Sequence, residues 1–370
     1  MIALRPSLAL LIPTLDQIGG AERQVLLLAQ SLAKLGWHVT VITLSGTANA
    51  ETAQLTHLGI DYFSLEMRRA WVDPQGWRRY IAWHRQNQPA IIHAHLPHAT
   101  WFARCVRPFA PVRVVIDTIH TSNTGTLARK LLYRLTRPLT THVTCVSDAV
   151  AQTTLAAKMA NQNKLSVLPN GVPLPKLSDE RKQQRSFHWV AIGRLSPVKD
   201  YPTLLQAFAL LPQGASLTIA GTGPEEATLR KLAATLDIAA RVHFAGFQPN
   251  IQPLLQSADA FVLSSRWEGL PISVLEASAA SLPVVATDGA GTGEALISEQ
   301  TGLLVPVGNP EALASAMVKI MELPTAESQK MGSNGRRFIE ENFSLPAVTA
   351  RWESLYLRLL ATHSDPAAFG

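Results

Sequence analysis

The sequence predicts an α/β protein with two domains, each built on a parallel sheet that helices cover on both faces. Three observations lead to this prediction. The chain has 370 residues, which is too long for one ordinary domain and fits two. Short apolar runs alternate with segments of helical spacing along both halves. Several of these runs end at a glycine-rich turn after which a helical pattern begins.

The first half of the chain, residues 1–170, is expected to form the first domain. A helical pattern from Glu22 to Leu35 follows its first apolar run, and further helical segments separate the later ones. Strands are expected at 8–12, 39–44, 90–94, 112–119, 142–146 and 165–168. A stretch with prolines and many charges at 171–185 predicts a linker.

The second domain is expected over residues 186–345. Its strands are expected at 187–192, 217–220, 242–247, 260–264, 283–286 and 302–306. A last helical pattern lies in residues 346–370, where Trp352, Leu355, Tyr356 and Leu359 recur on one face. By its position alone, this helix could cap the second domain.

The segment SSRWEGLPISVLE is the most informative part of the second domain. It places Glu268 and Glu276 around a Gly-Leu-Pro turn, after the apolar run 260–263 and at the start of a helical pattern. Open α/β sheets bind ligands at the carboxyl ends of their strands. Two carboxylates there suit a polyhydroxylated ligand, because each accepts several hydrogen bonds from hydroxyls. The alternative is an exposed loop acid and an unrelated acid on a helix surface.

Two cations leave another strand of the same domain. Arg194 and Lys199 follow the run 189–192 and precede a helical pattern. Arginine offers a bidentate fork and lysine a mobile point charge, and together they suit a diphosphate. Glycine-rich turns at 221–225 and 288–294 allow close backbone approach, although single turns of this kind also merely punctuate α/β folds.

The first domain carries a smaller set of candidate residues. Gly19 and Gly20 stand between the first strand and its helix, where backbone amides can approach a phosphate or simply form a tight turn. His93 and His95 point to the same face of a strand, and His98 follows them. No matching cluster of Asp, Glu or Cys and no Asp-x-Asp motif accompanies these histidines, so a strand-end histidine near an acceptor is favoured over a metal site.

The segments GRLSPVKDYPTLLQAF, IAGTGPEEATL and SSRWEGLPISVLEASAASLPVVAT resemble the carboxyl-terminal domain of the family 4 retaining glycosyltransferases. The E-x7-E spacing of Glu268 and Glu276 is the sharpest part of the match. The first half agrees, with GGAE at 19–22, His120 after a later strand, and VSDAVA and VLPNGVP near its end. The resemblance covers roughly residues 7–360. It implies the GT-B architecture, with two Rossmann-like domains facing a central cleft and a closing helix that crosses back onto the first domain.

The resemblance also implies a reaction and a set of roles. A sugar moves from a nucleotide-diphosphate-sugar to a hydroxyl of a cell-surface or lipid-linked glycan, with retention and without a metal or other cofactor. The second domain binds the donor and the first contacts the acceptor. The implied catalytic residues are His120 and Glu268. The implied diphosphate-binding residues are Gly19, Gly20, Arg194 and Lys199, and those for sugar and ribose are Glu268, Gly269, Leu270 and Glu276.

Two other functions stay open. A sugar-nucleotide epimerase can share this architecture and would convert the donor without any acceptor. A nicotinamide-dependent oxidoreductase also uses paired α/β domains. Against it, the first strand–helix turn reads Ile18-Gly19-Gly20-Ala21-Glu22 and not G-x-G-x-x-G, and no acid clearly ends the second strand.

Composition indicates where the protein acts. The two cysteines, Cys105 and Cys145, are too few for a disulfide framework, and no signal peptide or membrane-spanning stretch is visible, so the expected location is the cytoplasm. Residues 1–170 carry 17 Lys and Arg against 8 Asp and Glu, or +9. Basic residues gather with aromatic or apolar ones at 68–85 and 129–137, which suits peripheral contact with an anionic membrane. A solvated helix face is the alternative, and no nucleic-acid recognition module is present.

Overall fold

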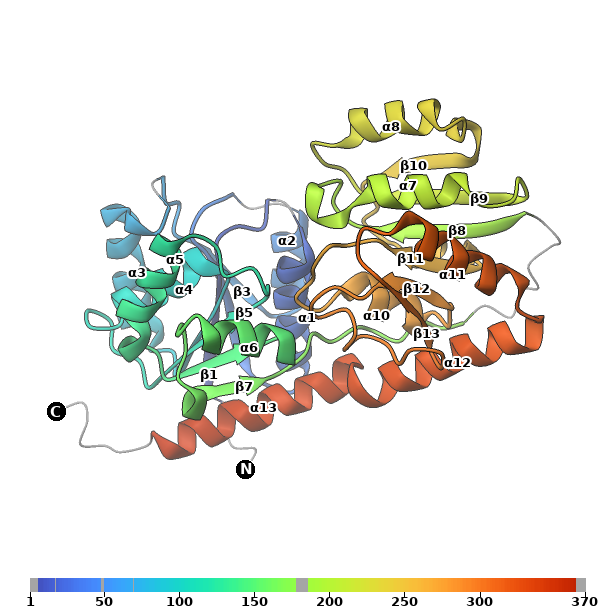
Figure 1. The fold of residues 1–370 in the computed structure, drawn as a ribbon. Helices are drawn as coiled ribbons and strands as arrows, with labels where there is room; N and C mark the ends of the chain where they lie inside the picture. Colours follow the sequence, from blue (N-terminus) through green and yellow to red (C-terminus); the bar gives the residue numbers. More distant parts are fainter. Residues whose placement is uncertain (1–5, 17, 48–49, 69, 178–185, 364–370) are drawn as a thin grey trace. The chain divides into compact units, whose positions relative to one another are not determined.

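The computed structural model describes residues 6–363 apart from 17, 48–49, 69 and 178–185. The chain forms two compact units (Figure 1). One comprises the chain up to Gly171 together with the segment from Leu345 onward, and the other is Val172–Ser344. Much of the expected linker, residues 178–185, lies outside the described residues.

The first unit is built on a parallel sheet. In its described part, seven strands lie in the order β3-β2-β1-β4-β5-β6-β7, and all neighbours are parallel. The chain runs outward in opposite directions from the β1–β4 pair, which is therefore the topological switch point. The strands are β1 (Ser7–Ile12), β2 (His38–Thr43), β3 (Asp61–Ser64), β4 (Ile91–His95), β5 (Val114–Ile119), β6 (His142–Cys145) and β7 (Leu165–Val167).

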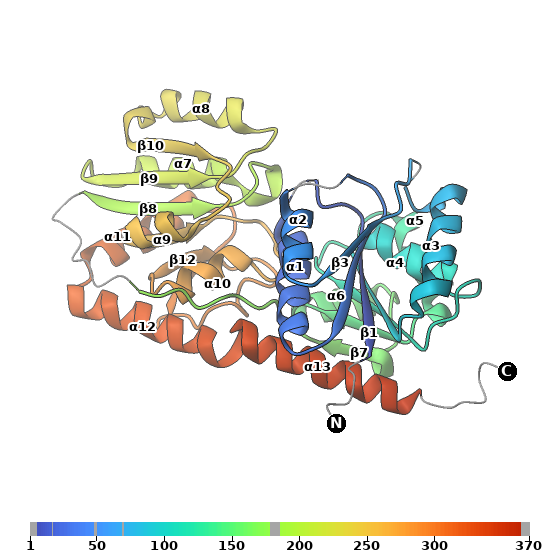
Figure 2. The same ribbon diagram turned by 180° about the vertical axis from the view of Figure 1, so that it is seen from behind.

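Helices cover both faces of this sheet. Successive side chains of β1 point to opposite faces, and both sets are buried. Leu8 and Leu10 belong to a core that includes residues of α1 and α13, whereas Ala9 and Leu11 belong to a second core with α3 and α4. The closing helix α13 crosses α1 (Figure 2), and the apolar residues of the two helices share one core. The helices are α1 (Gly20–Lys34), α2 (Ala50–His57), α3 (Pro74–Asn87), α4 (Pro97–Val106), α5 (Leu127–Thr136), α6 (Asp148–Ala156) and α13 (Leu345–Thr362).

A buried side-chain amide holds the chain where it leaves the first unit. Gln24 of α1 donates from Nε2 to the Gly171 carbonyl at 2.9 Å and accepts from the Gly171 amide at 3.0 Å. A side chain at Gly171 would meet Val348 Cβ at 3.1 Å and Leu345 Cα at 3.3 Å. Glycine at this position therefore allows the segment to lie against α13.

The second unit repeats the plan with a smaller sheet. Its described residues form six strands in the order β10-β9-β8-β11-β12-β13, all parallel, with the switch point at the β8–β11 pair. The strands are β8 (Phe187–Ile192), β9 (Ala215–Ala220), β10 (Val242–Gly246), β11 (Ala260–Leu263), β12 (Val284–Thr287) and β13 (Gly302–Val305).

The helices of the second unit again form two layers. Residues of α7, α8 and α11 share one core with the sheet, whereas α9 and α10 lie toward the viewer in Figure 2, on the other face. Trp189 and Phe208 are fully buried in the core that α7, α8 and α11 share with the sheet. The helices are α7 (Tyr201–Ala209), α8 (Glu226–Thr235), α9 (Gln252–Ser257), α10 (Ile272–Ala279), α11 (Pro310–Glu322) and α12 (Thr325–Asn342).

The prediction of paired parallel-sheet domains is confirmed, with one strand missed. The edge strand β3 spans only Asp61–Ser64, begins with an exposed aspartate and is half-buried along the rest of its length. Such a segment carries no continuous apolar run, because it lies at the edge of the sheet and its side chains are not fully buried. The other strands lie within about three residues of the apolar runs that predict them.

Two further expectations concern the whole chain. Across the described ranges, no helix combines the length and apolar character needed to cross a bilayer. Cys145 is buried and Cys105 half-buried, and both are free thiols. Burial raises the pKa of the Cys145 thiol to about 12, so that thiol is inert at neutral pH.

Candidate functional site

In the second unit, the candidate residues gather at the switch point of the sheet. Arg194 and Lys199 follow β8, Glu268 follows β11, and these two strands are neighbours. Lys199 Nζ lies 2.6 Å from Glu268 Oε1, and each side chain is only 16% exposed. Glu268 Oε1 also accepts a hydrogen bond from Ser265 Oγ at 2.7 Å. The structure thus joins the predicted diphosphate lysine to the predicted sugar carboxylate, and it leaves Arg194 exposed on the loop that carries Lys199.

The two loops that carry this ion pair are bonded along their length. Ser264 Oγ donates to the Lys199 carbonyl at 2.8 Å, and the Arg266 amide donates to the Val198 carbonyl at 2.8 Å. The Arg266 guanidinium adds a contact of 3.2 Å to the buried Asp200. These bonds hold the backbones of the two loops together around the ion pair.

The glycine-rich turns bring these loops together. A Cβ at Gly221 would lie 2.0 Å from the Gly193 carbonyl oxygen, and one at Gly291 would lie 2.1 Å from the Gly269 carbonyl oxygen. Both glycines also have positive φ, 143° and 81°. The sequence predicted that backbone could approach closely at these glycines. In the structure, the group that approaches each glycine is the backbone carbonyl of a neighbouring loop. Because these glycines have no side chain, four loops can pack together at one edge of the sheet.

The remaining donor-side residues lie on the segment from Glu268 to α10. The Glu268 amide donates to the Ala290 carbonyl at 2.9 Å, which ties this segment to the turn at 288–293. Leu270 is buried, and Glu276 is buried within α10. The turn bends the chain between the two carboxylates, so Glu268 stands in a loop and Glu276 on the following helix, as the sequence predicts.

In the first unit, the turn after β1 is closed by its own helix. Gly19 is the N-cap of α1, and its amide donates to Glu22 Oε2 at 3.1 Å in a capping box. The Gly19 amide is therefore already bonded, and a carboxylate lies beside it. Burial raises the pKa of Glu22. Any phosphate at this turn must rely on Gly20 and the following amides, and must meet or displace the Glu22 carboxylate.

Three histidine rings lie in a row, tilted against one another, at the carboxyl ends of β4 and β5. The rings of His93 and His95 are 4.0 Å apart, and those of His95 and His120 are 5.3 Å apart. His95 Nδ1 lies 3.0 Å from His120 Nε2. Burial lowers the pKa of His120 to about 4 and lowers the pKa values of His93 and His95 well below their usual range. All three are neutral at pH 7, because burial disfavours the charged form of each ring.

His95 and His120 line a small pocket at the carboxyl ends of β4 and β5. Leu168–Gly171 and residues of α1 and α13 complete its lining, among them Gln24 and Trp352. In the described part of the chain, no group of three or more His, Cys, Asp or Glu is placed to hold a metal ion. The sequence indicated His95 only as a member of the HAHLPH run. Its bond to His120 could not be predicted, because His95 ends β4 and His120 follows β5, and sequence spacing does not report contacts between separate strands.

The aromatic residues at 68–85 pack against a core, Tyr80 fully and the three tryptophans in part. Trp77 and Tyr80 pack edge-on against Phe102 in the core beneath α3 and α4, and Trp77 donates from its indole nitrogen to the Trp71 carbonyl at 2.8 Å. Tyr80 is fully buried and cannot anchor a surface, and membrane contact through the rest of this segment stays a prediction. The helical spacing of Trp77 and Tyr80 reflects the buried face of α3, and Arg78, Arg79 and Arg85 occupy its exposed face.

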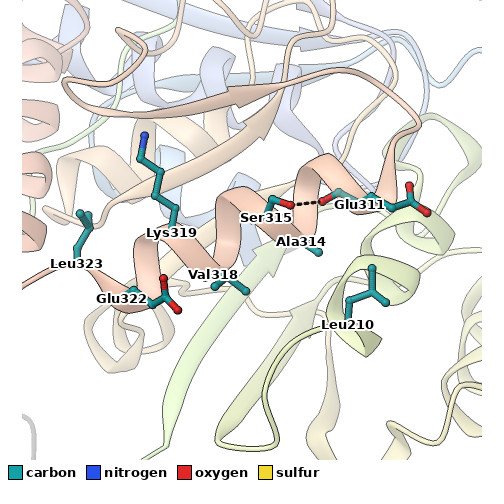
Figure 3. A pocket seen from close by; sticks show the side chains of 8 residues that line it. All are labelled: Leu210, Glu311, Ala314, Ser315, Val318, Lys319, Glu322 and Leu323. Atoms are coloured by element: carbon teal, nitrogen blue, oxygen red, sulfur yellow. Dashed lines mark hydrogen bonds between the residues drawn. The ribbon is translucent and has the colours of Figure 1, made fainter.

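A shallow hollow lies on the second unit, away from the loops of the switch point. It follows one side of α11 beside Leu210 at the end of α7 (Figure 3). Its polar side chains are Glu311, Ser315, Lys319 and Glu322. Ser315 donates to the backbone carbonyl of Glu311 within the helix, so these groups do not converge on a common point (Figure 3). The hollow offers no chemistry comparable with that of the switch point.

Known families and structures match both units. Residues 18–176 match the family model described as Glycosyltransferase Family 4, and residues 177–338 match the model described as Glycosyl transferases group 1. The chain is 35% identical over 173 residues to the lipopolysaccharide core biosynthesis glycosyltransferase LpsE of Rhizobium meliloti (strain 1021). That alignment covers 47% of this chain and spans about half, 49%, of LpsE.

Two longer matches extend the comparison. The chain is 24% identical over 295 residues to the Escherichia coli UDP-Gal:alpha-D-GlcNAc-diphosphoundecaprenol alpha-1,3-galactosyltransferase, covering 73% of this chain and 76% of that protein. Among solved structures, HepE of Anabaena in complex with UDP and glucose aligns with a TM-score of 0.81 at 18% identity. That alignment covers 95% of this chain and 99% of HepE, and it shows a common fold.

Proposed function

The chain belongs to glycosyltransferase family 4, and we propose that it moves a sugar, with retention, from a nucleoside-diphosphate sugar to a hydroxyl of a lipid-linked or cell-surface glycan. One observation carries the proposal: a lysine and a glutamate meet at the switch point of the second sheet, with an exposed arginine beside them. Cations there suit a diphosphate, and a carboxylate suits sugar hydroxyls.

Each residue then has a role in the transfer. Arg194 and Lys199 hold the diphosphate, Glu268 with Gly269 and Leu270 receives the sugar, Glu276 binds the ribose, and His120 of the first unit contacts the sugar. The bond between the anomeric carbon and the diphosphate oxygen breaks as the acceptor oxygen forms its new bond to that carbon. The acceptor proton passes to the departing phosphate. Catalysis then consists of positioning and of stabilising the negative leaving group, which the two cations do without a metal.

The donor and acceptor classes are part of the proposal. HepE carries UDP and glucose in its solved complex, which supports a uridine nucleotide as the first donor to test. LpsE is named for lipopolysaccharide core synthesis and the Escherichia coli relative for a diphosphoundecaprenol-linked acceptor, which supports a glycan on a lipid carrier.

A screen of nucleotide sugars tests the proposal. Purified protein is mixed with UDP-, GDP- and ADP-sugars and lipid-linked glycan acceptors, and release of the free nucleoside diphosphate is measured with and without EDTA. We expect release that needs both donor and acceptor and survives EDTA, and a product whose anomeric configuration by NMR matches that of the donor. An epimerase would change the sugar without releasing nucleotide, and an inverted product would refute retention.

The proposal includes contact between α5 and an anionic membrane. Leu127, Leu131 and Leu135 follow one another at four-residue intervals along α5 and are 83%, 55% and 68% exposed. The buried Arg104 holds α5 from beneath, donating to the Tyr133 carbonyl and to Thr136 Oγ1 at 3.1 Å each. The leucines thus stand outward on a fixed helix.

Basic side chains accompany this leucine stripe. Arg134 is exposed, and Lys130 and Arg137 are half-buried. Arg129 contributes less, because its Nε is buried and its guanidinium lies near His98, whose pKa is lowered by burial and then by this positive charge. Cations near an anionic leaflet are attracted by about 1 kcal/mol each, and the attraction fades with salt. Leucines and cations on one helix therefore fit an anionic lipid surface.

Vesicle flotation tests this contact. We expect binding to vesicles with anionic lipid, weak binding to neutral vesicles, and loss when Leu127, Leu131 and Leu135 are all replaced by Ser. Leu210→Ser, at an exposed leucine of the second unit, is the matched control and should bind normally. Equal binding to neutral and anionic vesicles would contradict the proposal.

A further inference from the structure

The bond between His95 and His120 poses a question of proton placement. Their nitrogens Nδ1 and Nε2 lie 3.0 Å apart, and both rings are neutral at pH 7. A neutral imidazole carries one N–H and one acceptor nitrogen. One ring must therefore donate to the other, and the choice decides which nitrogen of His120 carries its proton.

The neighbouring His93 has its proton placed by a separate chain of bonds. Thr144 Oγ1 donates to the Asp117 carbonyl at 3.3 Å, so Thr118 Oγ1 must donate to Thr144 at 2.7 Å. His93 Nε2–H then donates to Thr118 at 2.6 Å, and the Tyr356 hydroxyl donates to His93 Nδ1 at 2.7 Å. Both nitrogens of His93 are used, so it meets His95 only through its ring.

The other nitrogen of His95 decides the direction of the remaining bond. His95 Nε2 is buried and has no hydrogen-bond partner among the described residues. If His120 donated, His95 would carry its proton on Nε2 as a buried N–H without an acceptor. If His95 donates, Nε2 keeps only an unused lone pair. Orphaned buried N–H groups are rarer than unused acceptors, so His95 Nδ1–H is the donor.

We propose that His95 is a positioning residue that holds His120 as the neutral Nδ1–H tautomer, so that His120 donates a hydrogen bond to a substrate hydroxyl oxygen. This inference rests on the proposed function for its substrate. It makes His120 a hydrogen-bond donor and excludes it as a general base, because its acceptor nitrogen Nε2 is occupied by His95. The His93 ring lies against one side of His95, with the ring centroids 4.0 Å apart and the rings tilted by 41°, and it restricts the ring that must donate.

The backbone beside His95 is consistent with a fixed placement. Leu96 has φ 69° and ψ 154°, a combination that is costly for any residue other than glycine. Pro97 follows at the first position of α4. The turn that ends β4 is therefore held in an uncommon conformation directly after the positioning residue.

Three variants test the proposal. His95→Asn keeps an N–H donor close to the position of Nδ1, whereas His95→Leu keeps the volume and removes the donor. His142→Leu is the matched control, because His142 is also a buried histidine of this sheet, bonded to Ser166 at 2.9 Å and away from the row of histidine rings. Uridine diphosphate binding and thermal stability check that each variant is folded.

The first readout is the tautomer itself. In protein labelled with 15N-histidine, the His120 signals, assigned by their loss in His120→Gln, should show Nδ1 protonated at pH 7 in the wild type, in His95→Asn and in the control. In His95→Leu, the proton should move toward Nε2. Wild-type His120 protonated on Nε2 would overturn the proposal, whether or not the protein transfers sugar.

The second readout is turnover with the donor and acceptor found in the nucleotide-sugar screen. We expect His95→Leu to lower kcat about tenfold, the loss of one hydrogen bond, with unchanged affinity for uridine diphosphate. His95→Asn should recover most of the rate, and His142→Leu should keep it. Equal kcat for the Asn and Leu variants would overturn the positioning role. If no donor and acceptor support turnover, the proposed function fails, and the tautomer measurement still decides the placement of the proton.

Discussion

Replacing Glu268 by Gln should raise the affinity of the second unit for a nucleoside diphosphate. Lys199 Nζ is bonded to Glu268 Oε1 at 2.6 Å, so a diphosphate must compete with Glu268 for this lysine. Glutamine keeps the size and the hydrogen-bonding oxygen of the side chain but removes its charge. The lysine is then held less tightly, and the carboxylate no longer repels the incoming phosphates.

The structure sets the size of the effect. Each partner is 16% exposed, so solvent screens the pair only in part. A hydrogen bond with a charged partner contributes about 1.5–3 kcal/mol; the ion pair lies toward the upper end of this range, and the bond from the Lys199 ammonium to a neutral glutamine lies toward the lower end. The substitution should therefore free about 1–1.5 kcal/mol for phosphate binding. Since 1.4 kcal/mol is a factor of ten, the affinity should rise about five- to tenfold.

Isothermal titration calorimetry with uridine diphosphate measures this change. Glu299→Gln is the matched control, because Glu299 pairs with Lys319 at 2.8 Å in the same unit, where the two side chains are 67% and 55% exposed. It makes the same change in net charge and should leave the affinity within about twofold. Turnover should fall in Glu268→Gln, because the sugar loses its carboxylate. A folded Glu268→Gln protein that binds the nucleotide no better than wild type would refute the competition.

Three other outcomes are expected. Arg194→Ala should weaken uridine diphosphate binding about tenfold by calorimetry, through loss of a charge-assisted contact, and unchanged affinity in a folded variant would contradict its role. Glu276→Ala should weaken binding of the bare nucleotide while Glu268→Gln does not, and an equal loss in both would contradict the division between ribose and sugar. Burial lowers the pKa values of His120 and His142 to about 4, whereas an unfolded histidine titrates near pH 6.5. The unfolded chain therefore binds more protons between these values, and the free energy of unfolding should fall with acidification by up to about 1.4 kcal/mol per pH unit for each histidine. Urea unfolding at pH 7 and pH 5 measures this slope, which His142→Leu should reduce; an unchanged slope would show that His142 is not its source.

The sequence by itself determined the class of fold and the edge of the sheet where the chemistry lies. Apolar runs mark the strands because parallel strands are buried on both faces. The loops after β8 and β11 could be assigned to one edge because parallel strands all end on the same side. That reasoning placed Lys199 and Glu268 in the same region before any contact was known. It could not find β3, which lacks an apolar run.

Only the tertiary structure decided which of these groups touch and which are already occupied. Periodicity could not tell that Trp77 and Tyr80 face a core, because a buried stripe and an exposed aromatic stripe have the same spacing along a helix. The bond from His95 to His120 joins residues 25 positions apart, on neighbouring strands. Its direction depends on a buried nitrogen without a partner. Sequence patterns report the local conformation and the side that is buried, whereas hydrogen-bond partners and protonation depend on distances between elements, which only the packed fold sets.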